Sequence, residues 1–148
     1  MTLDFDAQAI ALSARFDPGV VTPPAGYDNI VVSTADIPEA LPRTPCVLVF
    51  LDQGAMETGN GTRLGKHEWT VRFYYGQVTD LPRQNVACRK WAGVLVDQLR
   101  GAVQLGGTVA RATVDGYTVG MLRYGNGTYA GIELKVTTVT TEGWGATS

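Results

Sequence analysis

The sequence predicts an α+β fold, a mostly antiparallel sheet of about five strands with two main helices packed on one face. Three observations lead to this class. One unbroken apolar run and several alternating runs have the length and pattern of β-strands. Two other segments repeat apolar residues at the three- and four-residue spacing of amphipathic helices. In chain order these elements read helix, strand, strand, helix and then strands only, which indicates a single domain over residues 1–148.

The first predicted helix covers residues 3–16. Phe5, Ala9 and Leu12 recur at helical spacing, and acidic residues occupy the first turn, where the helix dipole favours them. A Pro-Gly pair then ends the helix. Because prolines interrupt the later pattern, we predict an extended Pro-rich connection over residues 17–44.

A wide hairpin is predicted next. Residues 46–51 form an unbroken apolar run, typical of a central strand covered on both faces. Residues 66–75 alternate, with Trp69 and Phe73 on the side that we expect to face the core. Between them, residues 52–65 are rich in glycine and nearly free of hydrophobic side chains. We therefore predict a flexible loop that protrudes from the hairpin and contacts something outside the monomer.

The second helix is predicted over residues 80–103. Asp80 supplies an N-cap, and an early proline fits the first turn. Cys88, Trp91 and Leu95 form an apolar stripe along one side of this segment. The stripe predicts an amphipathic helix that packs on the sheet.

The last third of the chain predicts a meander of three strands, over residues 108–114, 117–124 and 128–140, and we expect Ile132, Leu134 and Val136 of the last strand to face the core. Asp115-Gly116 and Asn126-Gly127 separate the strands, and such pairs are typical of tight hairpin turns. After them, residues 141–148 have no pattern and predict a loose C-terminal tail. Trp144 in this tail is either a docked plug or a contact between subunits.

Groups that could carry catalysis are sparse and scattered in the sequence. His67 lacks Cys, Asp or Glu at ligand spacing, so we expect a solvated or edge histidine and no metal site. No serine lies in a G-x-S-x-G elbow, and residues 59–65 depart from both the Walker A and the dinucleotide patterns. Cys46 and Cys88 fit buried core thiols. We therefore expect a protein that is not an enzyme and needs no cofactor.

The charge is distributed unevenly. Residues 1–57 hold eight acids and two bases, a net charge of −6, whereas residues 58–148 hold six acids and ten bases, a net charge of +4. This asymmetry is compatible with pairing inside the domain or with pairing between the unlike parts of neighbouring subunits. The sequence has no dense Lys/Arg cluster of the kind that binds nucleic acid, and no run apolar enough to cross a membrane.

The layout as a whole resembles a family of virus proteins. A helix ending in Arg15-Phe16, a Pro-rich connection leading into Thr44-Pro45-Cys46-Val47-Leu48-Val49, a glycine-bearing hairpin, a long helix from Asp80 and a closing strand written Tyr129-Ala130-Gly131-Ile132-Glu133-Leu134-Lys135-Val136 carry the resemblance. Together they resemble the tail terminator and related tail-completion proteins of long-tailed, siphovirus-like bacteriophages.

The resemblance implies a structural protein of the virion, assembled in the host cytoplasm and located in the tail or neck. Such a protein forms a ring, as a hexamer, on the head-proximal end of the tail tube, ends tube polymerisation and docks the connector or stopper protein of the head. DNA passes through the central channel without sequence-specific binding. We expect contacts between subunits or with the tube at Asp52, Glu57, Thr62, Arg63, Arg111 and Trp144.

Two alternatives remain at this point. A neck or head-completion protein, which joins head to tail, belongs to the same structural class. A small-ligand binding domain is a different class, and it predicts a monomer or dimer with an apolar pocket between sheet and helices.

Overall fold

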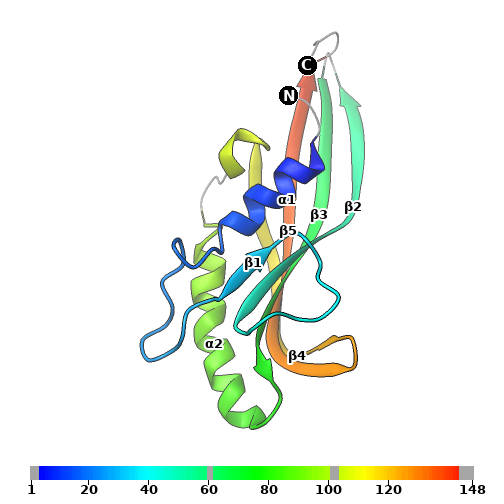
Figure 1. Ribbon diagram of the computed structural model, residues 1–148. Helices are drawn as coiled ribbons and strands as arrows, with labels where there is room; N and C mark the ends of the chain where they lie inside the picture. The colour runs from blue at the N-terminus through cyan, green and yellow to red at the C-terminus, as the bar shows by residue number, and fades with distance from the viewer. Residues whose placement is uncertain (1–3, 60–61, 101–103, 144–148) are drawn as a thin grey trace.

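The computed structural model describes residues 4–59, 62–100 and 104–143 (Figure 1). Its elements are helix α1 (Phe5–Ala14), strands β1 (Val32–Thr34), β2 (Cys46–Gly59) and β3 (Thr62–Gln77), helix α2 (Leu81–Asp97), the 3-10 turn η1 (Leu105–Gly107), and strands β4 (Arg111–Tyr124) and β5 (Gly127–Gly143). The five strands form one sheet in the order β1-β2-β3-β5-β4. Strand β1 runs parallel to β2, and the other neighbouring pairs are antiparallel. The predicted α+β class with a mostly antiparallel sheet is confirmed.

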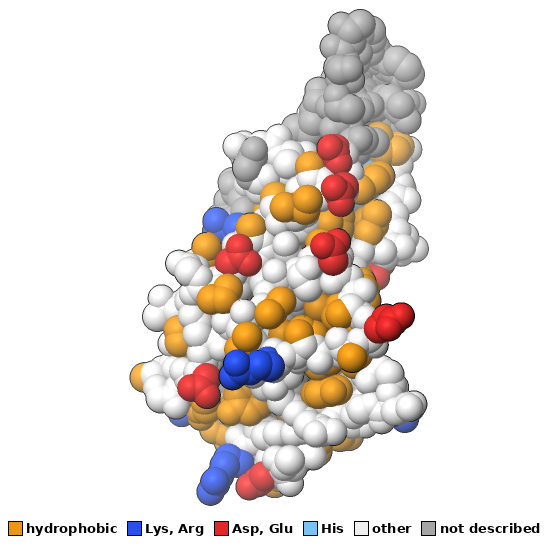
Figure 2. Space-filling model, in the orientation of Figure 1, with side chains coloured by type: hydrophobic (Ala, Val, Ile, Leu, Met, Phe, Trp, Pro, Cys, Tyr) orange, Lys and Arg blue, Asp and Glu red, His pale blue; other side chains and the backbone are white. Residues whose placement is uncertain are grey.

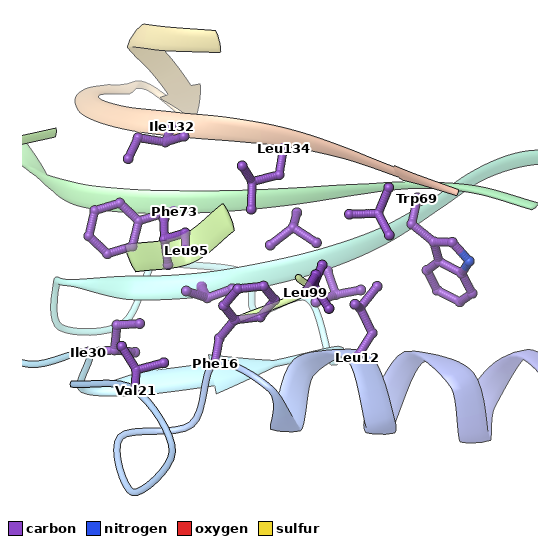
Figure 3. Close-up of a cluster of buried hydrophobic side chains, with 14 of the residues drawn as sticks. Leu12, Phe16, Val21, Ile30, Trp69, Phe73, Leu95, Leu99, Ile132 and Leu134 are labelled. Atoms are coloured by element: carbon purple, nitrogen blue, oxygen red, sulfur yellow. The ribbon is translucent and has the colours of Figure 1, made fainter. Parts of the chain in front are cut away.

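The main core lies where alternate residues of the middle strands meet both helices (Figure 3). Leu12 of α1 and Trp91 of α2 belong to one buried cluster, together with Phe16, which follows α1. The strands contribute Val47, Val49, Trp69, Val71, Phe73, Ile132, Leu134 and Val136. The predicted apolar stripe of α2 and the predicted inward residues of β3 and β5 are confirmed.

A smaller cluster covers the opposite face, which we call the far side of the sheet. Cys46, Leu48 and Tyr74 are buried there. Leu41 packs against them, and the Tyr124 hydroxyl donates a hydrogen bond to the carbonyl oxygen of Pro38. Part of the Pro-rich connection therefore lies over this side. Residues 46–49 are buried on both faces, as predicted for a central strand, but Phe50 is half-buried and Leu51 is exposed, so the prediction is wrong for the end of the run 46–51.

The Pro-rich connection contains a strand that its sequence did not predict. Residues 32–34 form β1, which pairs with residues 46–48 of β2. Before it, Ile30 is buried in the main core, and the amide of Val31 donates to the carbonyl of Pro45. A three-residue strand gives no periodic signal, because its pairing with β2 is decided by tertiary contacts.

The predicted loop over residues 52–65 is wrong, because β2 and β3 continue as paired strands through it. Their register runs on from Gln53 paired with Glu68 to Gly59 paired with Thr62. On its other side β3 pairs with β5, which continues to Gly143. Backbone hydrogen bonding thus forms strands from a segment that has little core to cover. Figure 1 shows these three strands extending together beyond the helices.

We call this extension the arm and define it as residues 55–59 of β2, 62–66 of β3 and 139–143 of β5. The three strands are level with one another at the base of the arm, since Ala55 pairs with Lys66 and Lys66 with Val139. The predicted loose tail is therefore corrected for residues 141–143, which belong to β5. Residues 144–148, with Trp144, lie outside the described residues.

The turn predicted at Asp115-Gly116 is also wrong. Residues 111–124 form the single strand β4, which pairs with β5 on both sides of a bulge between Val114 and Gly116. The Asp115 carboxylate accepts a hydrogen bond from Thr137 on the far side. A bulge accommodates the same residue types as a turn, so this pair of residues does not discriminate between them. The turn at residues 125–126, by contrast, connects β4 to β5 as predicted.

Both helices are shorter than predicted, and their caps explain the ends. Helix α1 begins after Asp4, whose carboxylate accepts from the amide of Ala7 at 2.9 Å. Helix α2 ends at Asp97 instead of residue 103. The side chain of Arg15, the residue after α1, reaches this end of α2. Arg15 donates to the Gln98 carbonyl at 2.6 Å, and the Gln98 amide donates to the Arg15 carbonyl at 2.7 Å. These bonds satisfy terminal carbonyls that the helices leave open.

Candidate functional site

One edge of the sheet is the full length of β4. Strand β4 is last in the strand order, and its neighbour in the described chain is β5. Along it, Arg111, Thr113 and Thr118 are exposed, and Tyr117 and Met121 are large hydrophobic residues that are 60% and 59% exposed. A long strand edge that displays apolar side chains is a surface on which another strand can add.

The opposite edge is formed in two parts. Strand β1 covers residues 46–48 of β2, and beyond them β2 itself is the outer strand of the described sheet. Residues 52–55 of this portion are exposed. On the core side, beside this edge, lies an apolar groove of about 370 Å³ lined by Phe5, Ala9, Ile37 and Leu51 together with neighbouring residues. The two edges are therefore unlike: one presents bulky apolar side chains, and the other is bordered by an apolar groove.

The structure places five of the six expected contact residues at different parts of the sheet. Asp52 lies on β2 at a bulge, and Arg111 begins β4 on the opposite edge. The backbones of Glu57, Thr62 and Arg63 belong to the arm. Trp144 lies outside the described residues. Within the chain the described members thus occupy two edges and the arm rather than one patch.

A charged network crosses the far side between the two edges. The Lys135 ammonium lies 2.8 Å from the Thr70 hydroxyl, 3.5 Å from an Asp52 carboxylate oxygen and 3.4 Å from a Glu133 oxygen. The other Glu133 oxygen accepts from Arg72 Nε at 3.0 Å. Because these groups are partly exposed, each ion pair contributes modestly to stability, and their main effect is a fixed polar surface.

Asp52 and Lys135 of this network also line an open groove of about 490 Å³, whose walls include Glu68 and Asp115 as well. Both wall aspartates sit at bulges, which turn their carboxylates toward the far side, where Asp52 accepts from Thr70 and Asp115 from Thr137. The polar side chains around the groove therefore form hydrogen bonds with one another.

The chemistry available in this groove is limited by access. Thr70 is the hydroxyl placed between a carboxylate and an ammonium, an arrangement that can activate a nucleophile. Thr70 is only 3% exposed, and its hydroxyl already donates to Asp52 and accepts from Lys135. A substrate therefore has no direct approach to it. Among the described residues, no three His, Cys, Asp or Glu side chains come close enough together to hold a metal ion.

His67 is a second polar feature, and the prediction of a solvated or edge histidine is wrong. It is 3% exposed on the middle strand β3, with Nε2 3.1 Å from the Thr140 hydroxyl and its ring edge-on to Phe5. A Cβ at Gly54 would lie 2.5 Å from His67 Nδ1, and one at Gly65 2.7 Å from Nε2. Two of the glycines that suggested a loop therefore make room for this ring.

Burial lowers the pKa of His67 from its ordinary value of 6.5, so the folded protein binds this proton less readily than the unfolded chain. Its contribution to the free energy of unfolding is complete above about pH 6.5 and is lost as the pH falls toward the lowered pKa. We expect His67→Gln to reduce the fall in unfolding free energy between about pH 7 and pH 5, because glutamine does not titrate. Urea unfolding at a series of pH values measures both slopes. Equal slopes in the two proteins would contradict the assignment.

Cys46 and Cys88 are free, buried thiols, which confirms the expectation of core residues. Burial raises the pKa of Cys46 to about 12 and that of Cys88 to about 11. Thiols with such pKa values carry little thiolate at neutral pH and react slowly.

Sequence reasoning missed Lys135 as the centre of the network and Tyr117 as an exposed edge residue. For Tyr117 the signal was absent, because the sequence did not show that β4 is the last strand. No helix in the described part of the chain has the length and apolar character needed to span a membrane. The chain matches no protein-family model, and comparison with curated proteins finds no match.

Proposed function

We propose that this protein is a structural component of a phage virion, whose copies form a hexameric ring on the head-proximal end of the tail tube. The ring ends tube polymerisation, binds the connector or stopper protein of the head and leaves a channel for DNA. The resemblance of the sequence to the tail terminator family supports this proposal. The structural observation that carries the proposal is the pair of unlike, exposed strand edges on opposite sides of one sheet.

Unlike edges favour a ring on symmetry grounds. A surface that binds a different surface on an identical copy makes a head-to-tail contact, and repetition of that contact closes a ring when the rotation fits. The arm gives such a ring a second feature, because three strands that extend beyond the helices can reach an adjacent layer such as the tube. The side chains of the charged groove already bond to one another, which is compatible with a role in assembly rather than in catalysis.

Sedimentation velocity and negative-stain imaging of the purified protein test this function. We expect a species of six copies and ring-shaped particles. A chain that stays monomeric at high concentration, with melting that shifts on adding small ligands, would favour the ligand-binding class instead. Binding of the ring to isolated heads rather than to tail tubes would favour a neck protein.

A variant with a shortened arm tests whether the arm is needed to cap the tail tube. Because Ala55 pairs directly with Lys66, residues 56–65 can be replaced by Asn-Gly, the preferred sequence for a two-residue hairpin turn. We expect this variant to keep a cooperative unfolding transition, since the main core lies outside the arm, and to lose capping of tail tubes. Retention of full capping would show that the arm does not contact the tube.

A further inference from the structure

We infer that neighbouring copies join by continuing the sheet, with the first half of β4 of one copy adding to the exposed edge of β2 of the next. This inference rests on the proposed function, and it specifies the surface and the partner, a second copy of this chain. Four properties of the described residues support it: strand direction, height along the sheet, side-chain fit and charge.

Strand direction allows the sheet to continue without a change of pattern. Strands β2, β3, β5 and β4 alternate in direction, because each neighbouring pair is antiparallel. Strand β4 therefore runs opposite to β2. When a rotation about an axis along the strands brings β4 of one copy beside β2 of another, the new pair is antiparallel as well. Antiparallel neighbours form well-aligned hydrogen bonds without any crossover connection.

The two edges also lie at matching heights. Through the register, Arg111 of β4 is level with Ala55 of β2, and Tyr117 is level with Val49. A rotation about an axis along the strands does not change the position of a residue along that axis. Residues 111–114 of one copy thus come beside the exposed residues 52–55 of the next, above the part of β2 that β1 already covers.

Side-chain fit adds an apolar contact next to the backbone pairing. Tyr117 pairs with Leu134 in β5 and so lies on the core side of the sheet, but at 60% exposure it has little to cover it in its own subunit. The apolar groove beside β2 is on the same side and includes Val49 and Leu51. Tyrosine combines a large apolar ring with a hydroxyl that stays hydrated, which suits a groove at the rim of an interface.

Charge disfavours pairing of two β2 edges with each other. The exposed residues 52–55 of β2 carry the acid Asp52 and no basic residue, whereas in the first half of β4 the charges of Arg111 and Asp115 cancel. Two β2 edges placed side by side would therefore bring two Asp52 carboxylates together. A β4 edge has no such net charge, so the unlike pairing avoids this repulsion.

Thiol cross-linking between two variants, each with one added exposed cysteine, tests the arrangement. Ala55→Cys places a thiol on the β2 edge and Thr113→Cys on the β4 edge, and both positions are exposed on the far side. Each variant alone should give no dimer with a short bis-maleimide, because identical edges do not meet. After mixing in equal amounts and reassembly, about a quarter of the interfaces hold both thiols, and we expect a cross-linked dimer. The native thiols of Cys46 and Cys88 are buried, so the protein without an added cysteine should give no cross-linked dimer.

The outcomes separate the inference from the proposed function. Arg89→Cys on the exposed side of α2 is the matched control, and its mixture with Ala55→Cys should give no dimer. Hexamers that form without the expected dimer would overturn the sheet continuation and leave the proposed ring intact. Dimers from either variant alone would show a two-fold contact and overturn it as well. A chain that never assembles would overturn both proposals.

A second measurement examines the apolar contact. We expect Tyr117→Ala to weaken assembly at least tenfold in the concentration at which hexamers form, while Thr118→Ala, a neighbouring exposed residue on the opposite side of β4, changes it less than twofold. Thermal melting of the monomer confirms that both variants fold. Equal assembly by the two variants would remove Tyr117 from the interface.

Discussion

Trp91→Ala is expected to lower the free energy of unfolding by roughly 3 to 5 kcal/mol, the cost of truncating a large buried aromatic side chain. Trp91 is fully buried at the centre of α2, and its ring centroid lies 4.8 Å from that of Phe73. The substitution removes this contact and leaves a cavity between the helix and the sheet that the backbone cannot close. Urea unfolding followed by circular dichroism measures the loss. A loss below about 1 kcal/mol, the scale of surface changes, would contradict the packing of α2 described above.

Trp91→Phe is the matched control for this prediction. Trp91 Nε1 is buried without a hydrogen-bond partner in the described residues. Phenylalanine keeps most of the buried apolar area and removes this unpaired donor, whose desolvation is unfavourable. We therefore expect Trp91→Phe to cost much less than Trp91→Ala. Similar losses for both would mean that the indole nitrogen has a partner, such as an ordered water.

Gly131→Ala is expected to destabilise the fold by about 3 kcal/mol, at the upper end of the range for overpacked interiors. Gly131 lies on β5 between β3 and β4, where added atoms have little space. A Cβ there would lie 2.3 Å from the carbonyl oxygen of Phe73 and 2.8 Å from Leu122 Cδ1. The first contact is with backbone, so strands β3 and β5 must move apart and weaken their hydrogen bonds. The midpoint of urea unfolding measures the change.

Gly120→Ala controls for the loss of glycine itself. Gly120 is the residue paired with Gly131 on β4, and a Cβ there meets nothing within 4 Å. Replacing glycine by alanine without a clash is neutral or slightly stabilising, because the unfolded chain loses conformational freedom. Equal effects at the two positions would show that β5 accommodates a side chain.

The elements that the sequence predicted well are those whose pattern is local. The stripe of α2 and the alternation of β3 and β5 record which residues face the core, so both the element and its buried side follow from spacing alone. The predicted number of about five strands also agrees with the sheet. The individual strands differ, because β1 was not predicted and β4 was divided in two.

The features that were missed depend on residues far apart in the chain. His67 is buried by Phe5 and Thr140, and neither contact is visible in its own neighbourhood. Residues 52–65 have the composition of a loop partly because Gly54 and Gly65 leave space for that ring, and their described part forms strands because pairing between β3 and β5 adds to the pairing between β2 and β3. The charged groove likewise unites Asp52 with Lys135, which only the register of three strands brings together.

The reciprocal bonds between Arg15 and Gln98 have a consequence for how the molecule opens. Helix α1 has only ten residues, too few to persist alone in water, and the carbonyl of its C-cap residue Arg15 accepts a hydrogen bond from Gln98, which follows α2. The α2 terminus in turn is held by the residue that closes α1. Fraying at one junction therefore removes a bond from the other, so we expect the two helix ends to open together.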